Sequence, residues 1–415
     1  MPPIFTQFDA VFNILLLVTV VTIVAKRLRI PYTIAMIFAG VMATFYPQFS
    51  LPRVSPEIFV SLLLPPILFE ETLTLDIEGF IEDSDTILSY AIAGTVIMAL
   101  AVTLFAYLIW GFTPMEAFLL GIIIAPTDPV AVIATLRKLG VIKRFQLLVA
   151  GESLFNDSVA IVVYSILVSA VSLGALTPSS ILRISIISVL GGVIVGIVGG
   201  YIVHMIFSWT DDKFCEVLLS FITAFGVFRM AEALGASGVL ATVLAGLIIN
   251  YRYRRVGGIG KESMEMLDVV WEFVGFTASC IAFIFVGKYL DPTLLVRHLL
   301  PAAALTLFTL TARYLMVDGI SRVMERFRGK QIPKNWRFGI FWSGLRGAVS
   351  IVLVLGISDL NLPHIEKMIA LIFGVVLATN MLQGLTMSTV VRRWALLANI
   401  GAEDVSIEEK PDGHS

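Results

Sequence analysis

The chain has 415 residues, of which 58% are apolar and only 14% are charged, and its mean hydropathy is +0.92. Soluble domains hold about 45–50% apolar and about 25% charged residues, so the composition excludes a soluble protein with one anchor and predicts a polytopic membrane protein. The net charge of −2 points to no particular partner, and we expect no nucleic-acid partner. The two cysteines, Cys215 and Cys280, lie in apolar runs and predict no disulfide framework and no cysteine-based metal site.

A helix needs about 20 predominantly apolar residues to cross a bilayer, and about thirteen segments have this character. They lie near residues 10–26, 32–46, 57–74, 86–112, 115–138, 146–171, 179–208, 213–233, 237–251, 264–289, 294–320, 335–357 and 365–391. We therefore predict an all-α polytopic membrane protein with about 13 transmembrane helices over residues 1–400. A short polar and acidic cytoplasmic tail is predicted over residues 401–415.

Lysine and arginine cluster in the connections after the first, fifth, ninth, eleventh and thirteenth segments. Cytoplasmic loops carry an excess of these residues, so the N-terminus is predicted outside the cell and the C-terminus in the cytoplasm. The connection after the third segment is instead predicted to be an acidic loop, with Asp76, Glu78, Glu82, Asp83 and Asp85. Acidic residues say little about which side of the membrane a loop lies on, so this connection does not change the predicted orientation.

The sixth segment contains the sequence GESLFNDS over residues 151–158. A charge at the bilayer centre costs about 2.5–3.5 kcal/mol on insertion scales, so such residues usually face a partner or a cavity. Helical spacing places Ser153 and Asp157 on one face, and Glu152 and Asn156 on the neighbouring face. The first face predicts a cation site and the second a structural network. The alternative is a single polar cluster that only fixes helix packing.

The fifth and twelfth segments are conspicuously interrupted midway, at residues 126–129 and 343–347. Paired interrupted helices in corresponding halves of a chain point to a transporter binding site. Pro126 and Pro129 cannot complete the helical hydrogen bonds, so carbonyl groups near Thr127 are freed. At membrane depth these groups must be satisfied, and a cation can do so.

Polar residues accompany both interruptions. Asp128 begins the second half of the fifth segment, where a carboxylate stabilises exposed N–H groups; a cap and an ion ligand are both open roles. Gly344 and Gly347 interrupt the twelfth segment, which a packing kink would also explain. Arg346 between them favours a functional break, because a cation offsets the C-terminal end of a half-helix.

Three further charged positions lie in apolar segments. Arg313, midway along the eleventh segment, needs an anionic partner, and Glu152 is a good candidate if Asp157 stays free for an ion. Arg346 is the rival partner. Glu70 and Glu71 end the third segment, and either a cavity-facing or an interfacial position is open to them.

Four motifs in this order resemble the NhaP/NHE-type sodium–proton antiporters, the Asn-Asp branch of the monovalent cation:proton antiporters. They are LPPILFE at 64–70, APTDPVAV at 125–132, GESLFNDS at 151–158 and GLRGA at 344–348. The resemblance covers essentially the whole chain. It implies thirteen helices with two inverted six-helix repeats, crossed broken helices, a homodimer in the lipid bilayer of the cell membrane, and elevator-like alternating access. It also implies electroneutral exchange of sodium or lithium for a proton, with no cofactor and no enzymatic activity.

By position, the resemblance makes Asp157 the shared site for the cation and the proton. Ser153 and Thr127 would be neutral ligands of the sodium ion, and Asp128 the cap or ligand at the crossing. Asn156 would replace the second carboxylate of the electrogenic branch. Because this residue is neutral, exchange should be electroneutral.

The resemblance also assigns the remaining charged residues. Glu152 would form an ion pair, with Arg313 as its first candidate partner. The family glutamate of the third segment matches Glu70, and the adjacent Glu71 leaves that register open.

Three alternatives compete with sodium–proton exchange. Potassium selectivity is one, since motif chemistry does not set the ion radius. An intramembrane hydrolase is another, but Ser153 is its only plausible nucleophile and has no histidine or lysine nearby in sequence to activate it. A cation channel is the third, although a channel needs no carboxylate that titrates in competition with the ion.

Overall fold

The structure, a computed structural model, describes residues 3–28, 30–45, 56–172, 177–207, 209, 212–256, 261–357, 360 and 362–398. Over these ranges the chain is helical and contains no strand, as predicted. The predicted tail at 401–415 lies outside them. By length and composition, eight continuous helical stretches of the described chain can cross a membrane, and shorter apolar helices accompany them.

Each predicted apolar segment coincides with one helix or with two consecutive helices. The helices are α1 (Pro3–Leu28), α2 (Tyr32–Thr44), α3 (Pro56–Thr74), α4 (Ile77–Leu88), α5 (Gly94–Trp110), α6 (Pro114–Ile124), α7 (Val130–Lys138), α8 (Lys143–Ser172), α9 (Pro178–Phe207), α10 (Lys213–Ala233), α11 (Gly238–Tyr251), α12 (Lys261–Tyr289), α13 (Pro292–Arg297), α14 (Leu299–Arg328), α15 (Lys334–Trp342), α16 (Ala348–Ile357), α17 (Ile365–Thr379) and α18 (Leu385–Ala398). Single π-helical turns join α4 to α5 and α17 to α18.

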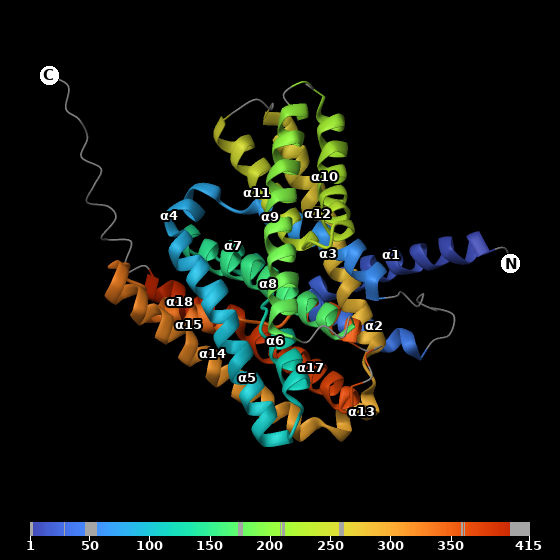
Figure 1. The fold of residues 1–415 in the computed structure, drawn as a ribbon, viewed down its shortest axis with the longest axis vertical. Coiled ribbons are helices and arrows are strands. Elements are labelled where there is room, and N and C mark those ends of the chain that lie inside the picture. The colour runs from blue at the N-terminus through green and yellow to red at the C-terminus, as the bar shows by residue number, and fades with distance from the viewer. Residues whose placement is uncertain are drawn as a thin grey trace.

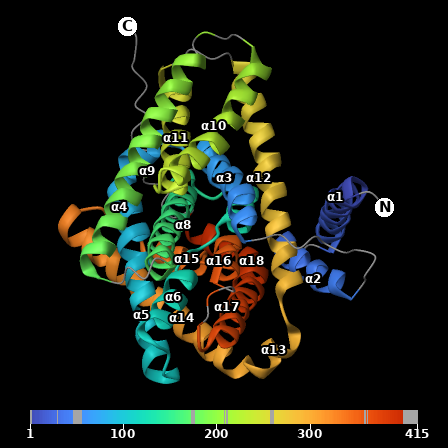
Figure 2. The same ribbon diagram turned by 45° about the vertical axis from the view of Figure 1, so that its right-hand side comes forward.

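The helices pack in two groups. In the first, α12 contacts α2, α3 and α10, and α11 contacts α3, α9 and α10. In the second, α5 contacts α6 and α14, and α17 contacts α14 and α16. Figure 2 shows α9, α10 and α12 extending toward the top of the view, while α5, α6 and α13–α18 lie in its lower part. Helix α8 contacts members of both groups, including α3, α4, α6, α9, α11 and α16, and runs through the middle of the molecule (Figure 1).

The predicted acidic loop after the third segment is wrong, because this stretch is helix α4. Asp76 caps the helix by accepting a hydrogen bond from the backbone N–H of Gly79. Asp83 pairs with Arg144 at 2.7 Å, and Asp85 pairs with Lys330 at 2.6 Å. These cations follow the fifth and eleventh segments, so the acidic stretch lies at the same end of the molecule as two basic connections. Partners distant in sequence stabilise a helix that the local charge pattern did not predict.

The eleventh predicted segment, 294–320, has different bounds in the structure. A short helix, α13, precedes a break at His298, and α14 then continues to Arg328. The charged end of α14 stays helical because Asp318 binds Arg322 one turn later, at 2.6 Å, and also Arg337, at 3.1 Å. Gly329 ends the helix with a φ of 67°, a left-handed conformation that favours glycine.

Candidate ion-binding site

The two interrupted helices touch at their breaks. The backbone N–H of Asp128, between α6 and α7, donates to the carbonyl oxygen of Leu345, between α15 and α16, at 2.8 Å. In return, Nη1 of Arg346 donates to the carbonyl oxygens of Ala125 at 2.6 Å and Pro126 at 3.1 Å. The arginine thus stabilises the C-terminal end of α6, the role expected for a cation at such an end.

Asp128 caps the second half-helix. Its Oδ1 accepts a hydrogen bond from the backbone N–H of Val130 at 3.0 Å, directly after Pro129. Its side chain also lies against Gly347 at the start of α16, where a Cβ atom would collide with it. One carboxylate therefore lies against the beginnings of both α7 and α16, and residue 347 must be glycine for the breaks to approach this closely.

Two residues of helix α8, one on each of its polar faces, form hydrogen bonds with Thr127. The hydroxyl of Ser153 donates to the carbonyl oxygen of Thr127. Nδ2 of Asn156 donates to Oγ1 of Thr127 at 2.8 Å, and the N–H of Thr127 donates to Oδ1 of Asn156 at 3.2 Å. The sequence predicted that Ser153 and Asn156 serve different faces of α8, one for a cation site and one for a structural network. In the structure both residues contact Thr127, so the two faces share this residue.

The ion pair buried beside this site joins Glu152 to Arg313. Oε1 of Glu152 and Nη1 of Arg313 are 2.9 Å apart, and each residue is 2% exposed. Arg313 also donates to the carbonyl oxygens of Ile340 at 3.0 Å and Phe341 at 3.3 Å, near the end of α15. It passes so close to Gly344 that a Cβ atom there would collide with its guanidinium group. Of the two candidate partners for Glu152, the structure therefore places Arg313 in contact.

We expect Glu152→Ala and Arg313→Ala each to destabilise the protein by about 3–5 kcal/mol, because removing one partner strands a buried charge. Thermal unfolding in detergent measures both losses. The double variant should lose much less than the sum of the two single variants, since it leaves neither charge unpaired. Strictly additive losses would contradict an energetically coupled pair. Arg322→Ala, which removes a cation that is exposed on the same helix, is the control and should change stability little.

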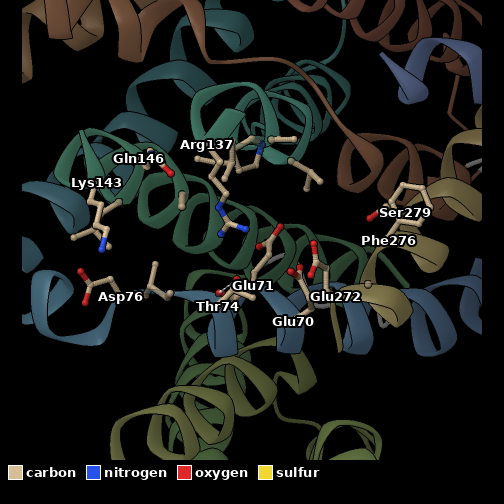
Figure 3. A pocket seen from close by; sticks show the side chains of 18 of the residues that line it. Glu70, Glu71, Thr74, Asp76, Arg137, Lys143, Gln146, Glu272, Phe276 and Ser279 are labelled. Carbon is tan, nitrogen blue, oxygen red and sulfur yellow. Dashed lines mark hydrogen bonds between the residues drawn. The ribbon is translucent and has the colours of Figure 1, made fainter. Parts of the chain in front are cut away.

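A large cavity of about 1180 Å³ opens between α3, α7, α8 and α12. Figure 3 shows three carboxylates, Glu70, Glu71 and Glu272, gathered on its wall, with the side chain of Arg137 directed toward them. Both glutamates of the doubled pair line this cavity, so neither is simply an interfacial residue at a helix end. The acidic wall offers an attractive surface for a cation.

A second, small cavity of about 10 Å³ lies next to Asp157 and the two breaks. Glu71, Val130 and Ser279 line both cavities, so the small one adjoins the large one. Asp157 is 4% exposed, and its Oδ1 has no hydrogen-bond partner among the described residues. This carboxylate is therefore open to an ion or a proton from the small cavity.

The small cavity also contains residues that the sequence motifs did not predict. Ser279 of α12 and Ser350 of α16 line it, and each is a serine in an apolar stretch of its helix. The only sequence signal for Ser350 is its position three residues after Gly347, in the first turn after a break.

Comparison with known proteins identifies the family. The family described as "Sodium/hydrogen exchanger, transmembrane" matches residues 14–393. The chain belongs to this family. As a sodium/hydrogen exchanger it is a multi-span membrane protein and a transporter rather than an enzyme, and its cargo, sodium and protons, requires no cofactor.

Individual relatives extend this comparison. The chain is 32% identical to the "Low-affinity Na(+)/H(+) antiporter NhaS1" of Synechocystis, over 95% of this chain and 75% of that protein. It is also 32% identical to the "Na(+)/H(+) antiporter NhaP" of Pseudomonas aeruginosa, over 93% of this chain and 97% of the relative. Among solved structures, the sodium proton antiporter MjNhaP1 of Methanocaldococcus jannaschii has a TM-score of 0.76 at 18% identity, over 92% of this chain and 98% of that one. The last match shows a shared fold.

Proposed function

We propose that this exchanger is an electroneutral secondary antiporter that moves sodium or lithium against a proton across the cell membrane by alternating access. The observation that carries the proposal is the contrast between two adjacent buried carboxylates. Glu152 is neutralised by Arg313 at 2.9 Å, whereas Oδ1 of Asp157 has no partner within the described ranges. An unpaired carboxylate at membrane depth is costly, and binding a cation or a proton removes that cost.

The charge of the site supports electroneutral exchange. Asn156 is neutral and holds Thr127, so Asp157 is the carboxylate of this motif that remains for cargo. One sodium ion or one proton gives the loaded site the same charge. An empty, charged site is expensive to move through a low-dielectric barrier, and this penalty couples the two fluxes.

We assign Ser153 and Thr127 as neutral oxygen ligands, Asp128 as a cap that can also face the ion, and Glu70 or Glu71 as an acidic residue on the approach. Two of these side chains also hydrogen-bond within the protein: the Ser153 hydroxyl donates to the Thr127 carbonyl oxygen, and the Thr127 hydroxyl accepts from Asn156. Sodium ligation would use the remaining lone pairs of these oxygens. The hydrolase alternative is disfavoured, because the Ser153 hydroxyl donates to a carbonyl oxygen and not to a base.

The proposed architecture has thirteen membrane helices in two inverted repeats, with the N-terminus outside and the C-terminus in the cytoplasm. Its support is the placement of α6–α7 and α15–α16 as the two broken helices, seven predicted segments apart, with their breaks in contact. The two helix groups of Figure 2 would be a moving core and a scaffold, as in an elevator. The homodimer is proposed from the family resemblance.

The experiment that tests the function is sodium-driven proton movement in proteoliposomes. An outward sodium gradient should acidify the lumen and an inward sodium gradient should alkalinise it, with lithium also active. Clamping the membrane potential at zero should leave the rate unchanged if exchange is electroneutral. Equal rates with potassium would support the potassium alternative, and ion flux without proton coupling would support a channel.

A further inference from the structure

We propose that Ser350 of α16 supplies an oxygen ligand to the ion bound at Asp157, and that it helps set the sodium affinity and ion preference of the exchanger. The inference rests on the proposed function and adds one residue to the proposed ion-binding site. Ser350 is 1% exposed and lines the same small cavity as Asp157. In the part of the chain that the structure describes, its hydroxyl has no hydrogen-bond partner.

An unpartnered hydroxyl at this depth calls for an explanation. Leaving a buried polar group unpaired costs about 1–3 kcal/mol, and most buried polar atoms in proteins have a partner. Serines in apolar helices usually donate to the carbonyl oxygen one turn earlier, as Ser158 does to Leu154 at 2.9 Å in this chain. Ser350 makes no such bond within the described ranges, so its hydroxyl is available to a species inside the cavity.

Three residues that line this cavity, one from each of three helices, carry an oxygen that has no hydrogen-bond partner among the described residues. These oxygens are Oε2 of Glu71 on α3, Oδ1 of Asp157 on α8 and Oγ of Ser350 on α16. Alkali cations are hard ions that bind oxygen ligands. The arrangement therefore fits a cation better than it fits an empty packing defect, which would be lined by apolar groups.

The size of the cavity explains why a protein hydroxyl is needed. Its volume of about 10 Å³ is close to the space that a single water molecule occupies. A hydrated ion therefore cannot enter, and protein oxygens must replace the lost water, as carbonyl groups do in a selectivity filter. The carbonyl and hydroxyl oxygens of Thr127 each already accept a hydrogen bond from α8, so they have only their remaining lone pairs for an ion. Ser350 adds a neutral oxygen that has no partner among the described residues.

The electrostatic setting at Ser350 is compatible with a cation. The first turn of a helix normally repels positive charge, and Ser350 is the third residue of α16. The side chain of Asp128 lies against Gly347 at that helix start and offsets the repulsion. The hydroxyl is therefore presented to the cavity beside two carboxylates, Asp128 and Asp157, which also line it.

The test compares Ser350→Ala with the wild type and with Ser321→Ala. Ser321 is the control: it is also a buried serine in a helix, but its hydroxyl pairs with Tyr90 at 2.7 Å and the residue does not line the cavity. Apparent affinities for sodium, lithium and potassium are measured from proton movement in proteoliposomes. Thermal unfolding in detergent, with and without sodium chloride, measures ion binding independently of turnover.

We expect Ser350→Ala to lower the apparent sodium affinity about tenfold, equivalent to about 1.4 kcal/mol, and to narrow the preference for sodium over potassium. Its stability without sodium should equal or exceed that of the wild type, while the stabilisation by sodium should shrink. Ser321→Ala should show the reverse pattern, with lower stability and unchanged sodium affinity. Sodium affinity and ion preference that stay at wild-type values in a folded Ser350→Ala protein would overturn the assignment, and a water molecule would then be the natural occupant. If the wild type itself moves no protons in response to sodium or lithium, the proposed function fails, and the role of Ser350 fails with it.

Discussion

Asp157→Asn is expected to abolish sodium–proton exchange while leaving the protein folded. The substitution keeps the shape of the side chain but removes both the negative charge and the proton-binding oxygen. Because Oδ1 of Asp157 has no partner among the described residues, the amide strands no other charge. Removing an unpaired buried carboxylate should leave the thermal stability equal or higher. The measurements are sodium-driven proton movement in proteoliposomes and unfolding temperature in detergent.

The matched control for this variant is Asp318→Asn. Asp318 lies on α14, where it pairs with Arg322 and Arg337 away from both cavities. The same carboxylate-to-amide change there should retain exchange and cost some stability. Sodium-dependent proton movement that persists in Asp157→Asn would remove this residue from the mechanism and would direct attention to Glu71, which lines the same small cavity.

The broken helices were predictable because their causes are local. Pro126 and Pro129 cannot complete helical hydrogen bonds wherever the chain goes, and Gly344 and Gly347 interrupt an otherwise apolar run. Their mutual contact was not predictable from spacing. It depends on pairings such as that of the Asp128 N–H with the Leu345 carbonyl oxygen, which join parts of the chain far apart in sequence.

The residues missed at the site show where sequence reasoning stops. Ser158, which follows Asp157, and Ser350, three residues after Gly347, are both buried serines in membrane helices, and their neighbours in sequence do not show which hydroxyl has a partner. The structure separates them, since Ser158 donates to Leu154 and Ser350 has no partner within the described residues. Helix α4 was missed for the same reason. Its acidic residues were predicted to form a loop, because the residues that pair with them, Arg144 and Lys330, are distant in sequence.

The apparent sodium affinity is expected to fall as the pH drops, because sodium and a proton compete for Asp157. Where this carboxylate is mostly protonated, sodium must displace a proton. In the limit of one-for-one competition at a single site, the affinity then falls about tenfold for each unit of pH. Where the carboxylate is mostly ionised, the affinity becomes independent of pH. The direction follows from linkage: a proton and a sodium ion that exclude each other must each weaken the binding of the other by the same factor.

Transport with equal pH on both sides should therefore pass through a maximum. At low pH the proton holds the site and sodium rarely binds, and at high pH sodium holds the site and protons rarely return. Raising the sodium concentration tenfold should shift the acidic limb downward by about one pH unit in the same limit. The measurement is apparent sodium affinity in proteoliposomes between pH 5 and pH 8. An affinity that stays flat over this range, with exchange intact, would mean that the proton and the cation use different sites, because two ligands sharing one carboxylate cannot bind independently.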